Sequence, residues 1–294
     1  MLVLVTGSNG QLGKSISDLV SQNNSNHDFV FATREKLDLS EFKNVRSYIE
    51  KNQFDVIINC AAFTSVDRAE TETNYVNLIN HLSVNNLAEV ARDNNIKLIH
   101  ISTDYVFDGL SLDSYDESDL TSPLNVYGMT KLNSEIAIRS IMKFDAFIIR
   151  TSWVYSIHGN NFVDTILKLS KNKNELNVVS DQIGSPTFAK DLASALLSII
   201  DNEKFYLSNQ VSQIFHYSND GKCSWYEFAK EINRLTGSKC NIIPILSKDY
   251  PQDAERPKHV LLNKRKIIDF FDLEMSFWKD SLRECIQDLS SNSK

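Results

Sequence analysis

Short apolar runs alternate with stretches of helical periodicity through the first half of this chain. Runs rich in valine, isoleucine and leucine predict strands at residues 2–6, 29–32, 56–59, 98–102 and 146–150. Apolar positions at helical spacing between these runs predict helices at about residues 11–22, 40–52, 72–94 and 126–142. Strict alternation of strands and helices predicts a doubly wound α/β fold with a parallel sheet. The run 55–62 is almost continuously apolar, as expected for a strand covered on both faces.

The first strand runs directly into a glycine-rich turn, Thr6-Gly7-Ser8-Asn9-Gly10-Gln11-Leu12-Gly13. Glycine allows the positive φ of a tight strand-to-helix turn, and it lets a pyrophosphate approach backbone N–H groups. The helix that follows would direct its positive end at this anion. A glycine turn without a ligand is the alternative interpretation. The place of the turn between strand and helix, with Asp38 at the distance of an adenosine contact, favours a dinucleotide.

After residue 150 the alternation loosens, and we predict a strand near 176–179 and helices near 188–201, 225–235 and 277–289. Residues 1–150 are expected to form a dinucleotide-binding Rossmann domain. Residues 151–294 should form mainly a smaller α/β lobe that binds the substrate, with later segments returning to the first domain. Ligands of such sheets bind at the carboxyl ends of the strands, so functional residues are expected from Gly7, Arg34, Ala61, Ser102 and Arg150 onward.

Composition narrows the function classes. The 294 residues are 42% hydrophobic and 23% charged, as in ordinary globular proteins. A net charge of −7 without a dense Lys/Arg run argues against a nucleic-acid partner. No run approaches the ~18 apolar residues of a membrane span, and the apolar start is too short for a signal peptide. Four scattered cysteines, Cys60, Cys223, Cys240 and Cys285, indicate reduced thiols in a cytoplasmic protein without a zinc site.

Candidate acid–base chemistry lies in Tyr127 and Lys131. Residues four apart share one face of a helix, so this phenol and ammonium can enter one pocket. The lysine cation should lower the pKa of the tyrosine towards neutrality, which suits a general acid or base. Tyr127 also follows the fourth predicted strand, whose end offers the Thr103 hydroxyl for the same substrate oxygen. The pair Tyr226 and Lys230 has the same spacing but lies outside the alternating region, so we interpret it as a surface or packing pair.

Four motifs occur together: the glycine turn at 6–13, Asn59-Cys60-Ala61-Ala62, residues 102–107, and Tyr127-Gly128-x-x-Lys131. This combination resembles the extended short-chain dehydrogenase/reductase family. Residues 66–70, 122–128, 150–155, 160–162 and 181–187 narrow the match, because they resemble the dTDP-4-dehydrorhamnose reductase family. The resemblance is dense to about residue 191 and thinner beyond it, through Trp225 and Arg256-Pro257.

The resemblance implies a role for each matched residue. Thr103 would hydrogen-bond the C4 carbonyl oxygen of the substrate, Tyr127 would donate the proton, and Lys131 would bind the nicotinamide ribose and lower the tyrosine pKa. The other implied cofactor contacts come from Gly7, Asn9, Gly10, Gln11, Leu12, Arg34, Asp38, Leu39, Ala61, Ala62, Thr64 and Asn80. The implied substrate contacts, besides Thr103 and Tyr127, come from Asp104, Val106, Trp153 and Asn161. Core packing is the alternative for Trp153, and a loop cap is the alternative for Asn161.

The choice of cofactor depends on the end of the second strand, Ala32-Thr33-Arg34-Glu35. An acidic residue there would bind a ribose 2′-hydroxyl, whereas an arginine favours a 2′-phosphate. Arg34 therefore predicts NADPH, with NADH tolerated, unless it is a solvated charge beside Glu35. Some family members are said to dimerise through a magnesium ion held by glutamates. Ser15 and Lys190 occupy the aligned positions here, so we expect no metal and leave the choice between monomer and homodimer open.

The resemblance implies reduction of the C4 ketone of dTDP-6-deoxy-L-lyxo-4-hexulose, a nucleotide-sugar, to dTDP-L-rhamnose. Nucleotide-sugar dehydratases show Thr-Asp-Glu at the strand end, but Tyr105 follows Thr103-Asp104 here, so we do not expect dehydration. Two alternatives stay open. One is a reductase of a different 4-keto-6-deoxy nucleotide-sugar. The other is a non-catalytic NADP-binding regulator resembling the regulatory subunit of methionine adenosyltransferase.

Overall fold

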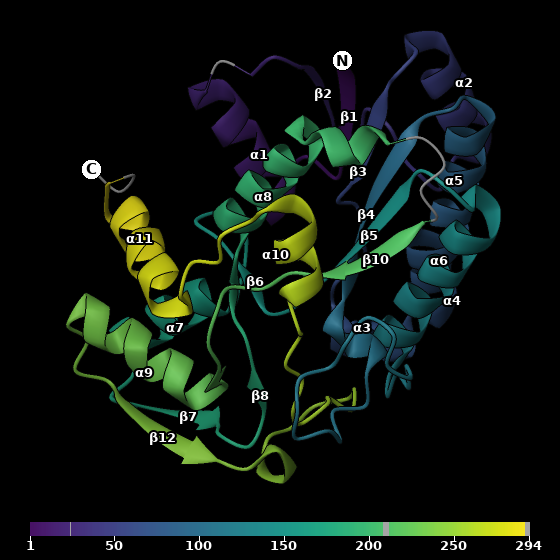
Figure 1. The fold of residues 1–294 in the computed structure, drawn as a ribbon. Coiled ribbons are helices and arrows are strands. Elements are labelled where there is room, and N and C mark those ends of the chain that lie inside the picture. Colours follow the sequence, from purple (N-terminus) through teal and green to yellow (C-terminus); the bar gives the residue numbers. More distant parts are fainter. Residues whose placement is uncertain (24, 208–211, 292–294) are drawn as a thin grey trace.

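A parallel sheet forms the centre of the molecule (Figure 1). The computed structural model describes residues 1–23, 25–207 and 212–291. In spatial order, the strands of the sheet are β10 (Gln213–His216), β5 (Ala146–Thr151), β4 (Lys97–Thr103), β3 (Val56–Asn59), β1 (Leu2–Thr6) and β2 (Asp28–Ala32). Every neighbouring pair is parallel. The predicted doubly wound parallel sheet is confirmed.

Helices cover both faces of the sheet because its strands bury apolar side chains on both sides. Val3 and Val5 of β1 pack with α1 (Gln11–Gln22), α8 (Ala189–Asp201) and α10 (Arg265–Phe271). Leu4, which alternates with them, faces the opposite cluster, where α2 (Phe42–Asn52), α5 (Ser83–Asp93) and α6 (Val126–Met142) pack. Figure 1 shows these two layers on either side of the strands.

The order of the strands places the candidate site. β1 pairs with β2 on one side and with β3 on the other, so the chain reverses its direction of growth between β1 and β3. From β3 the sheet then grows through β4 and β5 to β10. Ligands of open α/β sheets bind at such a reversal, beyond the carboxyl ends of the strands. Thr6, Asn59 and Thr103 end β1, β3 and β4 and therefore border this region.

A smaller lobe lies beside the sheet and has a core of its own, which includes Tyr155, Phe188, Phe228 and Trp278. Its helices are α7 (Phe162–Asn172), α9 (Trp225–Thr236) and α11 (Trp278–Ser291). Its strand pairs are β7 (Glu175–Val179) with β12 (Asn241–Ile245), β6 (Val154–Tyr155) with β9 (Thr187–Phe188), and β8 (Ile183–Gly184) with β11 (Cys223–Ser224). A capping box of Ser224 and Glu227 starts α9.

The structure differs from the sequence-based expectations at several elements. The helix expected over 72–94 is divided into α4 (Thr73–Asn77), a π-helical turn (Leu78–Leu82) and α5, and α3 (Val66–Thr71) precedes it. β10, β12, α10 and short 3-10 turns at Asp104–Val106, Glu203–Tyr206 and Ser247–Asp249 were not predicted. β10, α8 and α10 all belong to the layers of the central sheet, although they follow residue 150 in the chain.

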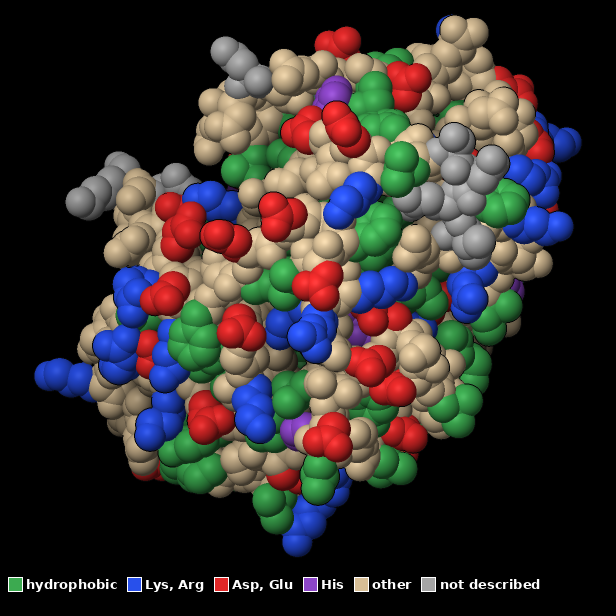
Figure 2. All heavy atoms as spheres, in the orientation of Figure 1, with side chains coloured by type: hydrophobic (Ala, Val, Ile, Leu, Met, Phe, Trp, Pro, Cys, Tyr) green, Lys and Arg blue, Asp and Glu red, His purple; other side chains and the backbone are tan. Residues whose placement is uncertain are grey.

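Two surface observations complete the fold. None of the helices in the described part of the chain is long and apolar enough to cross a membrane. On the face shown in Figure 2, Lys and Arg side chains intermingle with Asp and Glu side chains rather than gathering in an area of one sign.

Candidate active site

The glycine turn is built for the close approach of a ligand. Gly7 has φ +64°, and a Cβ there would lie 2.6 Å from the backbone nitrogen of Ala61. A Cβ on Gly13 would lie 2.5 Å from the Cα of Ser8, so α1 can pack against the turn only with glycine at this position. Gly10 caps α1 without a side-chain hydrogen bond, which leaves N–H groups of the first turn for an anion. A glycine turn with free N–H groups and no side chain in the way fits a dinucleotide pyrophosphate.

Helix α6, which carries Tyr127 and Lys131, is held close to the end of β4. Asn125 caps α6 by accepting a hydrogen bond from the Gly128 backbone N–H at 2.8 Å. Gly128 packs against the backbone carbonyl of Tyr105 and leaves no room for a Cβ. The backbone N–H of Val126 donates to Glu70 Oε1 at 2.8 Å, which ties the start of α6 to α3. These contacts bring the first turn of α6 against the 3-10 turn that follows Thr103.

Thr103 and Tyr127 meet at this point. The Thr103 hydroxyl is hydrogen-bonded to the phenol of Tyr127, and it also accepts the backbone N–H of Tyr105 at 3.2 Å. Asp104 Oδ1 lies 3.1 Å from the same hydroxyl. Thr103 and Asp104 are buried, whereas Tyr127 is half-buried. The predicted hydroxyl and phenol therefore converge on one place, where a carbonyl oxygen could accept from both.

The protonation of Tyr127 differs from the prediction. Burial raises the pKa of Tyr127 to about 12, and the hydrogen bond with Thr103 offsets only part of this effect. The expectation that Lys131 lowers the pKa of Tyr127 towards neutrality is wrong for the chain without a ligand. Lys131 Nζ lies instead 2.6 Å from the carbonyl oxygen of Ile101 and 2.9 Å from His100 Nε2. Burial also lowers the pKa of Lys131 to about 7.

Burial affects Asp104 as well, because its carboxyl has lost its contact with water. The pKa of Asp104 is raised to about 7, with hydrogen bonds from Thr103 and Tyr105 acting in the opposite direction. A carboxyl that titrates near neutrality beside Thr103 is a site feature that the sequence did not reveal.

Asn80 lies in the π-helical turn and is fully buried. Its Oδ1 accepts the Phe63 backbone N–H at 2.8 Å, and its Nδ2 donates to the Phe63 carbonyl at 3.0 Å. Asn80 thus holds the loop that contains Ala61, Ala62 and Thr64 at the carboxyl end of β3. Its own contact with a cofactor stays a prediction.

Arg34 lies at the end of β2 with a largely exposed side chain. Its Nε donates to Asp38 Oδ2 at 3.0 Å, and its Nη1 donates to the Tyr75 hydroxyl at 2.6 Å. Asp38 also accepts from the backbone and the hydroxyl of Ser40. The structure thus brings Arg34 and Asp38 together, while Leu39 is buried in the core beside them. Their contacts with the adenosine half of a cofactor stay predictions.

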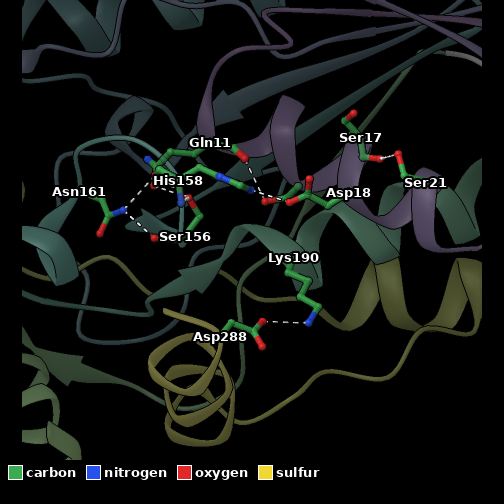
Figure 3. A network of polar contacts seen from close by, with 10 residues as sticks. Gln11, Ser17, Asp18, Ser21, Ser156, His158, Asn161, Lys190 and Asp288 are labelled. Atoms are coloured by element: carbon green, nitrogen blue, oxygen red, sulfur yellow. Dashed lines mark hydrogen bonds and ion pairs between the residues drawn. The ribbon is translucent and has the colours of Figure 1, made fainter. Parts of the chain in front are cut away.

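A polar network joins the glycine turn to the smaller lobe (Figure 3). The Ser156 hydroxyl lies 3.1 Å from Gln11 Oε1, and Gln11 Nε2 lies 3.4 Å from the Val154 carbonyl. Asn161 Nδ2 donates to the Ser156 carbonyl at 2.8 Å, and Asn161 Oδ1 accepts the Asp164 backbone N–H at 3.1 Å. Asn161 therefore caps α7, which was the alternative considered for it, and its contact with a sugar stays a prediction.

Trp153 occupies a constrained place between the lobes. Its backbone has φ +49°, an unfavourable conformation for a tryptophan. Its ring stacks on Trp225 with centroids 3.5 Å apart and an interplanar angle of 8°. Gly184 supports this stack, because a Cβ there would lie 2.7 Å from the Trp153 ring. The half-buried ring is available as an apolar wall, and its contact with substrate stays a prediction.

An arginine clamp, formed by Arg256 and Asp67, was not predicted as part of the site. Arg256 Nη2 lies 2.5 Å from Asp67 Oδ2, and Arg256 Nη1 lies 2.9 Å from Asp67 Oδ1. Arg256 also hydrogen-bonds the half-buried Tyr105 side chain. The Tyr105 ring meets the Tyr127 ring edge-on at 5.7 Å. The late segment of the chain thereby supports the candidate catalytic tyrosine, and the Arg256-Pro257 motif was the one sequence signal for it.

The remaining predicted residues lie around this site. Asn9 is exposed in the turn, whereas Leu12 and Val106 are buried in core clusters. Their ligand contacts stay predictions. The Tyr226–Lys230 pair is a cation–π contact on α9, with Nζ 5.4 Å from the ring centroid and Lys230 exposed.

The positions discussed for a metal are engaged otherwise. The Ser15 hydroxyl donates to the Gln11 carbonyl, and Lys190 pairs with Glu284 at 2.6 Å. Lys190 also pairs with Asp288 at 3.1 Å (Figure 3). Within the described residues, no group of three or more His, Cys, Asp or Glu side chains is arranged to hold a metal ion.

The fold is Rossmann-like, with a parallel sheet of six strands between helices. The family model of the RmlD substrate binding domain matches residues 1–291, and the chain belongs to this family.

Named relatives and a solved structure agree with this family. The chain is 39% identical to the spore coat polysaccharide biosynthesis protein SpsK of Bacillus subtilis (strain 168), covering 98% of both chains. It is 38% identical to a dTDP-4-dehydrorhamnose reductase of Aggregatibacter actinomycetemcomitans, covering 96% of this chain and 97% of that one. A crystal structure of dTDP-4-dehydrorhamnose reductase from Bacillus anthracis str. Ames in complex with NADP matches with a TM-score of 0.91 and 35% identity, covering 98% and 99% of the two chains.

Proposed function

We propose that this chain uses NADPH to reduce the C4 ketone of dTDP-6-deoxy-L-lyxo-4-hexulose, giving dTDP-L-rhamnose. The observation that carries the proposal is the contact between the Thr103 hydroxyl and the Tyr127 phenol at the end of β4. A phenol that can donate, next to a hydroxyl that can reorient, suits the oxygen of a ketone. The reductase names of close relatives support the substrate class.

The state of Tyr127 supports reduction in particular. A general acid must carry its proton before the reaction, and burial holds Tyr127 as the phenol. NADPH supplies the hydride that forms the new C–H bond at C4. Thr103 orients the carbonyl oxygen, and Tyr127 gives its phenolic proton to that oxygen, so a C4 hydroxyl forms and a tyrosinate remains. Asp104 stands beside these groups without the Thr-Asp-Glu pattern expected for dehydration.

Different elements would bind the cofactor and the substrate. The glycine turn and the first turn of α1 would hold the pyrophosphate of NADPH, with Arg34 near its 2′-phosphate. Trp153 would offer an apolar wall to the deoxysugar from the smaller lobe. We further propose a cytoplasmic location, supported by the four free cysteines. For the oligomeric state we propose a monomer or a homodimer.

The test is NADPH consumption with a panel of 4-ketosugar nucleotides, followed by identification of the product sugar. We expect the hexulose of the rhamnose route to be turned over fastest and to yield one alcohol. Faster turnover of another 4-keto-6-deoxy nucleotide-sugar would correct the substrate. If no 4-ketosugar nucleotide were reduced while NADPH still bound tightly, the enzyme function would be refuted in favour of a regulatory role.

A further inference from the structure

A buried chain of hydrogen bonds runs from the strands of the sheet to Lys131. The Thr6 hydroxyl contacts Asn59 Oδ1 at 2.7 Å, and Asn59 Nδ2 contacts His100 Nδ1 at 3.0 Å. His100 Nε2 then lies 2.9 Å from Lys131 Nζ. All four side chains are at most 1% exposed. Because the groups lie out of contact with water, each contact in this chain must pair a donor with an acceptor.

The contacts of Asn59 fix the first half of the chain. Asn59 Oδ1 accepts the backbone N–H of Ala61 at 3.2 Å, and a backbone N–H can only donate. The other polar atom of Asn59 is therefore the NH2 group, which donates to His100 Nδ1. A neutral imidazole has one donor and one acceptor nitrogen. With Nδ1 as the acceptor, the hydrogen of His100 lies on Nε2.

Ser134 leads to the same assignment independently. Its hydroxyl donates its single hydrogen to the Lys131 carbonyl at 2.6 Å. The Ser134 oxygen, 3.2 Å from His100 Nε2, must then accept from that nitrogen. Two sets of contacts thus place a hydrogen on Nε2, which is the nitrogen that faces Lys131.

This assignment restricts the charge of Lys131. An ammonium has three donors and no acceptor, so it would oppose the Nε2–H of His100 at 2.9 Å. An uncharged amine has a lone pair that accepts from Nε2–H and still donates one hydrogen to the Ile101 carbonyl at 2.6 Å. Protonating His100 would not remove the conflict, because both of its nitrogens would then be donors.

We propose that His100, oriented by Asn59, is a positioning residue that holds Lys131 as an uncharged amine in the cofactor-free chain. The inference deepens the proposed function, because Lys131 belongs to the same site. It means that, above the pH at which Lys131 titrates, the site at rest combines an uncharged phenol at Tyr127 with an uncharged amine at Lys131. Protonation of this amine would place a cation one helical turn from the tyrosinate.

Burial is the largest influence on Lys131 and favours an uncharged amine, whereas the nearby Glu135 carboxylate acts in the opposite direction. Burial lowers the pKa of Lys131 to about 7 and lowers that of His100 well below its usual value. Burial raises the pKa of the Cys60 thiol to about 12, so no thiolate faces the lysine at neutral pH. Glu135, the nearby carboxylate, is paired with Arg150 at 2.7 Å.

The experiment follows the lysine Cε signals by NMR in the full cofactor-free chain labelled with [6-13C]lysine. The Lys131→Met variant identifies the signal of Lys131. We expect this signal to titrate with a midpoint near pH 7. A midpoint near the ordinary lysine pKa of ~10.4 would overturn the proposal.

Asn59→Asp tests the role of His100. A carboxylate can accept from Thr6, from the Ala61 N–H and from an Nδ1–H of His100, which would turn Nε2 into an acceptor for an ammonium. We expect the midpoint of Lys131 to rise by about one pH unit or more. Asn172→Asp, which adds the same charge at an exposed position of α7, should leave the midpoint unchanged. If folded Asn59→Asp had an unchanged Lys131 midpoint, the proposed control of the Lys131 charge by His100 would be refuted.

A measurement on the unaltered chain covers the case in which Asn59→Asp fails to fold. In protein labelled with 15N-histidine, His100 should carry its hydrogen on Nε2 at neutral pH, and a hydrogen on Nδ1 would overturn the proposal. These spectra require no substrate. If Lys131 titrated near pH 7 but the chain reduced no ketosugar, the proposed function would be refuted and the inference about Lys131 would stand.

Discussion

Replacing Arg150 by methionine would leave a buried carboxylate without its cation. Arg150 and Glu135 have side chains that are each 2% exposed, and Arg150 Nη2 lies 2.7 Å from Glu135 Oε2. Arg150 Nε adds contacts at 3.0 and 3.2 Å, and the Ser102 hydroxyl donates to Glu135 Oε1 at 2.5 Å. Methionine preserves much of the side-chain volume, so the change removes the charge with little loss of packing.

The expected cost follows from this geometry. Breaking one side of a buried, fully hydrogen-bonded ion pair costs about 3–5 kcal/mol. Typical domains have only about 5–15 kcal/mol of stability, so the variant should be severely destabilised. The cost arises because the Glu135 carboxylate stays out of contact with water after its cation is removed.

Urea unfolding followed by far-UV circular dichroism measures this loss, with the m-value used to check that the transition is unchanged. Arg139→Met, at an exposed position of the same helix as Glu135, should stay within about 0.5 kcal/mol of the parent chain. The double variant Glu135→Leu/Arg150→Met should recover most of the loss because no unpaired charge remains. A cost below about 1 kcal/mol for Arg150→Met would refute the reasoning.

Three further predictions concern the site. Tyr127→Phe should lower kcat by roughly 10²–10⁴-fold in steady-state assays while NADPH binding persists, and Tyr226→Phe should change little. A larger loss of kcat in Tyr226→Phe would contradict the assignment of the general acid to α6. Arg34→Ala should weaken NADPH by about ten- to a hundredfold in Kd, because a charge-assisted contact is worth about 1.5–3 kcal/mol, and equal losses for NADH in titrations would contradict this. Asp104 has a folded pKa of about 7, above its unfolded value, so it should cost stability as the pH rises from about 4 to 7. Urea unfolding of Asp104→Asn at several pH values should show no such decline in stability. If the stability of both chains changed with pH in the same way, Asp104 would not be its cause.

Much of the fold could be predicted because its elements are marked locally. β3 has the same bounds as the apolar run 56–59, and α6 the same bounds as the helical pattern 126–142. The turn at Gly7 was predictable because only glycine suits its positive φ and close contact with Ala61. β10 was missed because its four residues form a strand only by pairing with β5, which lies far away in the chain.

The site was predicted less completely, for a physical reason. Spacing shows that Tyr127 and Lys131 share a helix face, but it does not show how much water each loses. Burial governs the pKa values of both groups, so the predicted direction for Tyr127 was wrong. The sequence shows His100 only as a polar residue in the middle of a buried strand. Its role depends on contacts with Asn59 and Lys131, which lie on other elements.

The return of β10, α8 and α10 to the central sheet has a consequence for protein engineering. A truncation after Arg150 would deprive β5 of its neighbour β10 and would strip two helices from one face. The central sheet with its covering helices therefore cannot be obtained as a fragment by a single cut. Grafting a different sugar specificity onto this scaffold would need several junctions, one at each place where the main chain crosses between the sheet and the smaller lobe.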